Sequence, residues 1–276
     1  MRCAVLGDPI AHSLSPVLHL AGYEAVGLDW TYDAVQVPSG GLSAFLATLD
    51  PSWRGLSLTM PLKREVLALG DAVSMVSPRA RAAGAANTVL LDGSLLHLDN
   101  TDLPGAAAAL RERYDGPVTA ATVIGAGATA AAVGLALCDL GARSVTVLAR
   151  DAARAEETMA AISAHPSAPL VSVAPLDAEV VGEVVVSTIP ASAQDAGLVD
   201  RCRATPVVFE VLYDPWPTPL AADVSHGGRG RVLVGGLDLL VHQAALQFEI
   251  FTGVPAPLTA MRDAGERVLA GRARRR

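Results

Sequence analysis

The sequence predicts an α/β protein built from two α/β domains. The chain has 276 residues, which exceeds the roughly 100–200 residues of one typical domain. Along most of it, short apolar runs bounded by glycine, proline or aspartate alternate with segments of helical periodicity. Apolar residues make up 51% and charged residues 18% of the chain, which excludes a disordered protein. Alternating strands and helices are typical of mostly parallel sheets covered by helices.

The first hundred residues predict a mostly parallel sheet with a hairpin strand at one edge. Ser15-Pro16 is typical of an N-cap and first helical position, and Gly27 ends that helix. Pro61 opens another helix, which is expected to run to Leu69. Asp92-Gly93 supplies the tight turn of the hairpin. Strands are expected at 3–7, 31–37, 55–58, 88–91 and 94–98, and a further helix at 42–49.

A second block begins near Pro104 and predicts a Rossmann-type sheet. Its expected strands are 120–124, 144–149, 170–173, 184–187, 207–211 and 231–234, with the main helices at 129–140 and 151–164. Residues 237–251 and 257–271 are helical with no strand to follow, so this end can pack back on the first domain. The predicted domains are therefore 1–103 with 237–276, and 104–236.

Charge and cysteine content exclude several classes of protein. The net charge is −7, whereas nucleic acids and anionic membranes require a basic face. Only residues 272–276 are strongly basic, and they are interpreted as a solvated tail. The three widely spaced cysteines predict neither a disulfide framework nor a metal site, which favours a reducing cytoplasm. The sequence opens directly on a strand pattern and not on a signal peptide, so a cytoplasmic protein is expected. The expected partner is a small molecule, for a monomer or a homodimer.

A glycine-rich loop carries the clearest binding signal. Gly125, Gly127 and Ala130 follow an expected strand and open an expected helix. In a dinucleotide fingerprint the first glycine makes the turn, the second admits the pyrophosphate, and the small third residue lets helix pack on strand. The alternative is a glycine turn in an ordinary α/β core, but the strand–loop–helix context favours a cofactor.

The residues after the next strand point to the type of cofactor. An arginine at this strand end suits the 2′-phosphate of NADP, whereas a carboxylate suits the ribose of NAD. Arg150 and Arg154 therefore favour NADP. Asp151 leaves NAD as the alternative, unless it is simply the N-cap of the next helix.

Lys63 is the candidate proton-transfer group. It is the only lysine in the chain, whereas arginine fills every other basic position and stays protonated in proteins. A place in the first turn of a helix disfavours an ammonium there. The alternative is a surface lysine beside Arg64. A polar cluster, 99–102, lies at the expected domain junction, where clefts form, although it can also begin a helix.

Four motifs in this order resemble shikimate dehydrogenases. They are residues 7–16 (GDPIAHSLSP), 57–63 (SLTMPLK), 84–88 (GAANT) and 99–102 (DNTD). Tyr213 and the segment 236–243 extend the resemblance across nearly the whole chain. It implies reversible, NADP-dependent oxidation of shikimate to 3-dehydroshikimate in aromatic amino-acid biosynthesis.

The resemblance also implies a role for individual residues. Lys63 matches the acid/base and Asp102 its partner, while Ser13 and Ser15 match contacts to the substrate carboxylate. The remaining substrate contacts are matched by Thr59, Asn87, Tyr213 and Gln243. The cofactor contacts are matched by Gly125, Ala126, Gly127, Ala128, Thr129, Arg150, Arg154, Val211 and Gly236.

The chain departs from the family pattern in several places, mostly on the cofactor side. Ser57 stands where the family usually has Asn, and Leu103 where it has Gly. The other departures are Ala149 and Asp151 around Arg150, Ser187–Pro190, and Asp238-Leu239. A quinate or aminoshikimate dehydrogenase shares the catalytic motifs and stays open as an alternative. Two further alternatives belong to other classes. A folate-type dehydrogenase would have no role for Ser13 and Ser15, and a non-catalytic NADP-binding sensor would have no role for Lys63 and Asp102.

Overall fold

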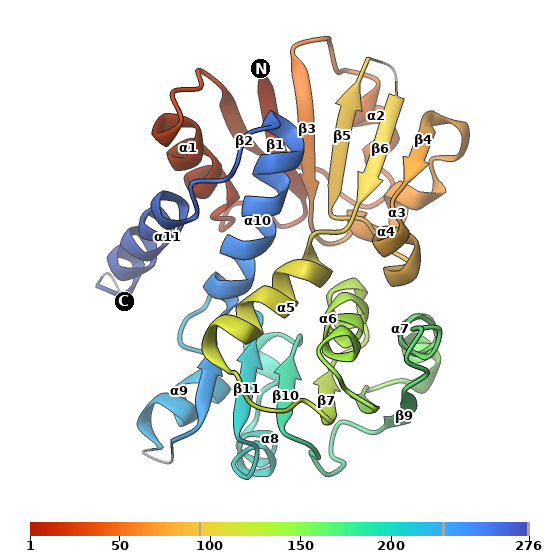
Figure 1. Cartoon of the computed structure of the whole chain (residues 1–276), viewed down its shortest axis with the longest axis vertical. Coiled ribbons are helices and arrows are strands. Elements are labelled where there is room, and N and C mark those ends of the chain that lie inside the picture. The colour runs from red at the N-terminus through yellow and green to blue at the C-terminus, as the bar shows by residue number, and fades with distance from the viewer. Residues whose placement is uncertain (94, 228–229, 275–276) are drawn as a thin grey trace. The chain divides into compact units, whose positions relative to one another are not determined.

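The computed structural model describes residues 1–93, 95–227 and 230–274, which form two compact units (Figure 1). The first unit comprises Met1–Thr101 and Leu240–Arg276, and the second comprises Asp102–Leu239. The sequence-derived boundaries fall at 103/104 and 236/237. Ser94 of an expected strand and Arg275 and Arg276 of the basic tail lie outside the described residues.

Each unit holds one six-stranded sheet, which confirms the predicted α/β class. The sheet of the first unit has the order β2-β1-β3-β5-β6-β4. Its strands are β1 (Arg2–Gly7), β2 (Thr31–Gln36), β3 (Trp53–Leu58), β4 (Val73–Val76), β5 (Thr88–Asp92) and β6 (Leu95–Asp99). Only β5, among these strands, runs antiparallel to its neighbours. The expectation of a hairpin at the sheet edge is wrong, because the unpredicted strand β4 pairs in parallel with β6 and takes the edge.

Helices cover both sheets. They are α1 (Ser15–Ala25), α2 (Leu42–Leu46), α3 (Leu62–Glu65), α4 (Pro78–Ala83), α5 (Asp102–Arg113), α6 (Ala128–Asp139), α7 (Ala152–Ser163), α8 (Ala196–Cys202), α9 (Pro219–His226), α10 (Gly236–Thr252) and α11 (Leu258–Ala273). The expected helix from Pro61 to Leu69 is instead the single turn α3 followed by a 3₁₀ turn, Val66–Ala68. In the described ranges, no helix is both long and apolar enough to cross a membrane.

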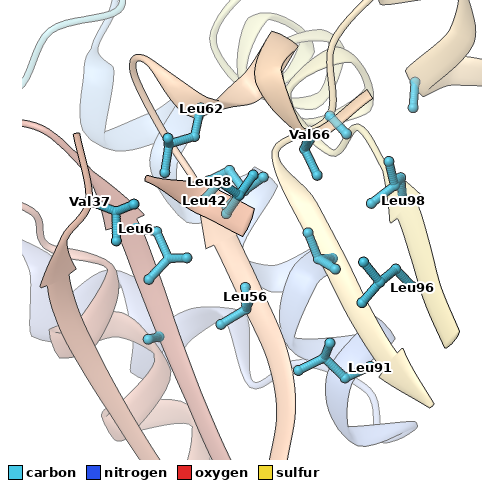
Figure 2. Close-up of a cluster of buried hydrophobic side chains, with 14 residues drawn as sticks. Leu6, Val37, Leu42, Leu56, Leu58, Leu62, Val66, Leu91, Leu96 and Leu98 are labelled. Atoms are coloured by element: carbon cyan, nitrogen blue, oxygen red, sulfur yellow. The ribbon is translucent and has the colours of Figure 1, made fainter. Parts of the chain in front are cut away.

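Aliphatic side chains fill one side of the first sheet (Figure 2). Leu6, Leu56 and Leu98 project from three different strands into one cluster and are almost completely buried. Leu62 and Val66, four residues apart, add the side chains of α3 and the 3₁₀ turn to the same cluster. Burial of each such side chain contributes about 1.5–3 kcal/mol, so this cluster fixes the strands whose ends carry polar residues.

Aromatic side chains fill the other side. Phe248 and Phe251 of α10 lie beside the buried His19 of α1, whose ring stacks on Tyr32 at 4.1 Å between centroids. Burial lowers the pKa of His19 to about 3, so the ring is neutral. Gly55 of β3 is required here, since a side chain at this position would overlap the Phe251 ring.

The second unit is an all-parallel sheet with the order β12-β11-β10-β7-β8-β9. Its strands are β7 (Ala120–Ile124), β8 (Ser144–Leu148), β9 (Leu170–Ala174), β10 (Val184–Ser187), β11 (Val207–Glu210) and β12 (Val232–Val234). Read in chain order, this is the 3-2-1-4-5-6 arrangement of the dinucleotide-binding fold. The strand order reverses between β7 and β10, where ligands bind in sheets of this kind.

An ion pair joins α4 to the end of β6. The Arg79 guanidinium donates Nε to Asp99 Oδ1 at 2.7 Å and a second nitrogen to Oδ2 at 2.6 Å. Ser77 Oγ donates to the same carboxylate at 2.6 Å. Although burial raises the pKa of Asp99, the hydrogen bonds from Arg79 and Ser77 outweigh it and hold that pKa below its usual value. Asp99 Oδ1 also accepts from the Asn100 N–H, so the pair fixes the start of the polar segment that follows β6.

We expect Arg79→Met to lower the Tm at neutral pH by about 2–4 °C. The pair contributes about 1 kcal/mol, because the Arg79 side chain is 38% exposed and solvent screens it. A depressed carboxyl pKa stabilises the fold above the unfolded value, and this contribution disappears as pH falls through the folded value. The difference between variant and parent should therefore narrow below about pH 4. Thermal unfolding followed by circular dichroism measures the Tm of variant and parent at each pH. The control is Arg81→Met, which removes an exposed arginine of the same helix. A Tm difference between Arg79→Met and the parent that does not change with pH would contradict a stabilising role for the Arg79–Asp99 pair.

Candidate active site

The candidate residues of the first unit lie at the carboxyl ends of its parallel strands. Strands β1, β3 and β6 run in one direction, and the antiparallel β5 begins where they end. Ser13 follows the end of β1, Thr59 follows β3, and Asn87 immediately precedes β5. The carboxyl ends of parallel strands are the usual position of α/β binding sites.

Asn87 and Gln243, which are 156 residues apart in sequence, are hydrogen-bonded to each other. Asn87 Nδ2 donates to Gln243 Oε1 at 3.1 Å and to Thr101 Oγ1 at 2.9 Å. Asn87 Oδ1 accepts from the Thr101 N–H at 2.8 Å. All three side chains are almost completely buried. The cluster offers amide and hydroxyl groups of the kind that pair with the hydroxyls of a polyol.

Main-chain hydrogen bonds hold Lys63 beside this cluster and Thr59 beside the end of β1. Lys63 O accepts from the Ala86 N–H at 2.7 Å, so the lysine backbone adjoins the residue before Asn87. Thr59 N donates to Leu6 O at 2.9 Å, and Gly7 admits this approach because a side chain at Gly7 would overlap Thr59. Lys63 is half-buried. The expected helix dipole contributes little to its environment, because α3 is a single turn.

Ser13 and Ser15 lie together at the start of α1. Ser13 Oγ accepts from the Ser15 N–H at 3.3 Å, and Ser15 is buried. The expected N-cap at Ser15 is wrong: Ser15 is the first helical residue and Leu14 precedes it, without a capping side chain. The helix start therefore combines two serine side chains with main-chain N–H groups, an arrangement that suits a carboxylate.

The glycine-rich loop of the second unit lies at the reversal of strand order. Gly125 follows β7 with a φ of +112°, and a side chain there would overlap Thr188 after β10. A side chain at Gly127 would meet no protein atom within 4 Å, so the space beside it is open. Ala128 and Thr129 begin α6, whose N-cap residue, Gly127, carries no capping side chain. Thr158 Oγ1 of α7 donates to Ala126 O at 2.9 Å and holds the loop in place.

Arg150 follows the neighbouring strand β8, and Arg154 lies in the first turn of α7. Both are exposed. Asp151 between them is the N-cap of α7, since its Oδ1 accepts from the Ala153 N–H at 2.9 Å. Arg154 lies 3.7 Å from the same carboxylate. The carboxylate is therefore engaged by the helix start, as the structural alternative for Asp151 predicted.

Val211 and Gly236 are also brought together. A side chain at Gly236 would overlap the main chain of Val211 and Leu212, so only glycine fits. Tyr213 lies two residues after Val211 and is half-buried. Asp102 begins α5, is buried, and belongs to the second unit, whereas Lys63 belongs to the first.

Sequence reasoning placed Thr101 in the polar segment 99–102 without assigning it a contact, and it missed Gln247 altogether. Gln247 Nε2 donates to Asn87 O at 2.9 Å, and its side chain is 1% exposed. Its spacing of four residues from Gln243 was the available signal, because residues i and i+4 share one face of a helix. Thr158 and Thr188, which shape the glycine-rich loop, left no comparable signal.

Comparison with known proteins identifies the family. The model of the shikimate dehydrogenase substrate binding domain matches residues 5–89, and that of the shikimate 5'-dehydrogenase C-terminal domain matches residues 236–264. The chain is similar to the shikimate dehydrogenase (NADP(+)) of Moorella thermoacetica, with 34% identity over 94% of this chain and 90% of the relative.

Solved structures of the same family match along nearly the whole chain. That of Mycobacterium tuberculosis shikimate dehydrogenase has 40% identity and a TM-score of 0.85, covering 98% of this chain and 99% of the other. That of Thermus thermophilus shikimate 5-dehydrogenase, in complex with NADP(H) and shikimate, has 31% identity and a TM-score of 0.83, covering 97% of this chain and 99% of the other. The chain belongs to the shikimate dehydrogenase family.

Proposed function

We propose that this protein is a shikimate dehydrogenase that oxidises shikimate reversibly to 3-dehydroshikimate with NADP, in aromatic amino-acid biosynthesis. The observation that carries the proposal is the buried contact between Asn87 and Gln243 at the carboxyl ends of the parallel strands, where Lys63, the only lysine of the chain, also lies. A substrate with several hydroxyls needs such fixed amides, and the oxidation of one hydroxyl needs a group that removes its proton. Family membership supports the same activity.

In this proposal the first unit binds the substrate and the second binds NADP. The residues of the second unit fit a dinucleotide: Gly127 leaves open space at the start of α6, and a helix N-terminus suits a pyrophosphate. Arg150 and Arg154 supply guanidinium groups for the 2′-phosphate. The remaining proposed contacts are Gly125, Ala126, Ala128, Thr129, Val211 and Gly236. When bound, NADP supplies the acceptor for the hydride that the alcohol carbon loses.

The residues of this chain bind and orient the substrate and exchange its proton. Ser13 and Ser15 hold the carboxylate at the start of α1, where hydroxyl and main-chain donors replace a basic side chain. Thr59, Asn87, Tyr213 and Gln243 pair with the rest of the substrate. Lys63 takes the proton of the hydroxyl that is oxidised and returns it in the reverse direction. Asp102 is its proposed partner.

Steady-state turnover of the purified protein tests the proposal. We expect activity with shikimate and NADP, and a lower kcat/KM with quinate, with aminoshikimate or with NAD. A higher kcat/KM for quinate or aminoshikimate would assign the chain to that activity within the family. Binding of NADP without turnover of any of these substrates would instead support the non-catalytic sensor.

We expect Lys63→Met to lower kcat by about 10²-fold to 10⁴-fold with a much smaller change of KM, because the proton-transfer group is lost and the binding groups remain. Steady-state kinetics with shikimate measures the loss, and Arg64→Met is the matched control. Lysine-selective modification at one site per chain should abolish turnover, and bound shikimate should protect the enzyme. Full activity of Lys63→Met would mean that another group takes the proton.

We expect Arg150→Ala to raise the KM for NADP and to leave the KM for NAD almost unchanged, because the lost guanidinium pairs only with the 2′-phosphate. The control is Arg143→Ala, which removes an exposed arginine just before the same strand, β8. Equal losses with both cofactors would exclude the assigned role.

We expect replacement of both Ser13 and Ser15 by Ala to raise the KM for shikimate by at least about 10-fold, since each hydrogen bond to a charged group contributes about 1.5–3 kcal/mol. The KM for NADP serves as the internal control and should stay constant. If the double variant keeps the parent KM for shikimate, the carboxylate binds elsewhere.

A further inference from the structure

We propose that Gln247 is a positioning residue that fixes the orientation of the Asn87 amide, through a directed chain of buried hydrogen bonds. The inference rests on the proposed function in one respect, namely that Asn87 contacts the substrate. Gln247 contacts Asn87 and the residue after it: Nε2 donates to the Asn87 main-chain carbonyl at 2.9 Å and to Thr88 Oγ1 at 3.0 Å. Thr88 Oγ1 in turn donates to Asn87 Oδ1 at 2.8 Å.

The orientation of the Gln247 amide itself is determined by its partners. A main-chain carbonyl can only accept, so the Gln247 nitrogen must face Asn87 O. The Gln247 oxygen then faces Ser57, whose Oγ donates to it at 2.7 Å. Ser57 Oγ accepts from Tyr32 Oη at 2.5 Å. Every polar atom of the Gln247 side chain is thereby satisfied in a site that is only 1% exposed.

The hydrogen bonds of Gln247 determine, through the Thr88 hydroxyl, which way the Asn87 side-chain amide is oriented. Because Gln247 donates to the Thr88 hydroxyl, the hydroxyl hydrogen is free to point only toward another acceptor, which is Asn87 Oδ1. That oxygen also accepts from the Thr101 N–H at 2.8 Å. With Oδ1 occupied, the Asn87 Nδ2 faces Gln243 Oε1. The Asn87 amide is therefore held with Nδ2 toward Gln243 Oε1 and Thr101 Oγ1, and a flipped amide would place its nitrogen against the Thr101 N–H, which can only donate.

A readout that does not depend on activity is available, because the chain has two asparagines, Asn87 and Asn100. In protein labelled with ¹⁵N-asparagine, two side-chain NH₂ pairs are expected, and Asn87→Ala assigns them. We expect Gln247→Leu and Thr88→Val to shift or broaden the Asn87 pair and to leave the Asn100 pair in place. Thr88→Ser keeps the hydroxyl and should restore the Asn87 pair. An unchanged Asn87 pair in folded Gln247→Leu and Thr88→Val overturns the proposal, whether or not shikimate is the substrate.

Kinetics then tests the consequence for binding. We expect Gln247→Leu to raise the KM for shikimate by about 10-fold to 100-fold, with a smaller change of kcat and with the Kd of NADP unchanged. In an Asn87→Ala background the same substitution should add less than about 3-fold, because Gln247 acts through Asn87. Thr252→Val, which removes a hydroxyl bonded to Phe248 O on the same helix, is the control and should keep the parent KM. Equal effects of Gln247→Leu with and without Asn87 would show a merely structural role.

Should Gln247→Leu fail to fold by circular dichroism, Thr88→Val carries both tests, since it has nearly the same shape as the parent side chain. A perturbed NH₂ pair with no turnover of shikimate by the parent would leave the positioning role intact and reject the proposed substrate. A parent that turns over shikimate, with an unperturbed NH₂ pair in the variants, would keep the function and reject the role of Gln247.

Discussion

The hydrogen bonds of the buried Asn87 hold β3, the end of β6 and α10 of the first unit together. Its main-chain N–H donates to Asp99 O at 3.1 Å, and its carbonyl accepts from the Leu58 N–H at 2.8 Å. Its side chain binds Thr101 and Gln243. An unsatisfied buried amide costs about 1–3 kcal/mol, so β3, the end of β6 and α10 must all approach this residue for the unit to fold. The same requirement brings the proposed substrate contacts together.

In the second unit, small residues allow the glycine-rich loop and the helices beside it to pack closely. Its loop after β7 passes so close to Thr188 that only glycine fits at position 125, and Ala130 at the start of α6 is completely buried. Gly134 admits Ile162 of α7 in the same way, which brings α7 close to α6. The departures from the family pattern at 187–190 thus fall on a residue, Thr188, that packs against the loop and donates to Ile124 O at 2.9 Å.

Local patterns in the sequence predicted much of the fold, because the buried strands of the second unit are short apolar runs bounded by breakers. The strand at 120–124 was predicted correctly for this reason, while the N-cap at Asp151 was considered only as an alternative to a contact with NAD. The edge strand β4 was missed because it is short and half-exposed, so its sequence lacks an apolar run. The motifs predicted which family the chain resembles, whereas the partnership of Gln247 with Ser57 spans 190 residues and depends on tertiary packing alone. The individual roles of the site residues remain predictions.

The hydrogen bond from Thr158 to the glycine-rich loop has a consequence for redesign. Thr158 and Arg154 lie four residues apart on α7, so one rigid helix supports the loop and carries a proposed contact to the 2′-phosphate. The support for the loop comes from the body of the helix, while the proposed discrimination between cofactors comes from residues at or before its first turn. An exchange of 149–154 therefore leaves Thr158, the anchor of the loop, in place while it replaces both arginines proposed to contact the 2′-phosphate.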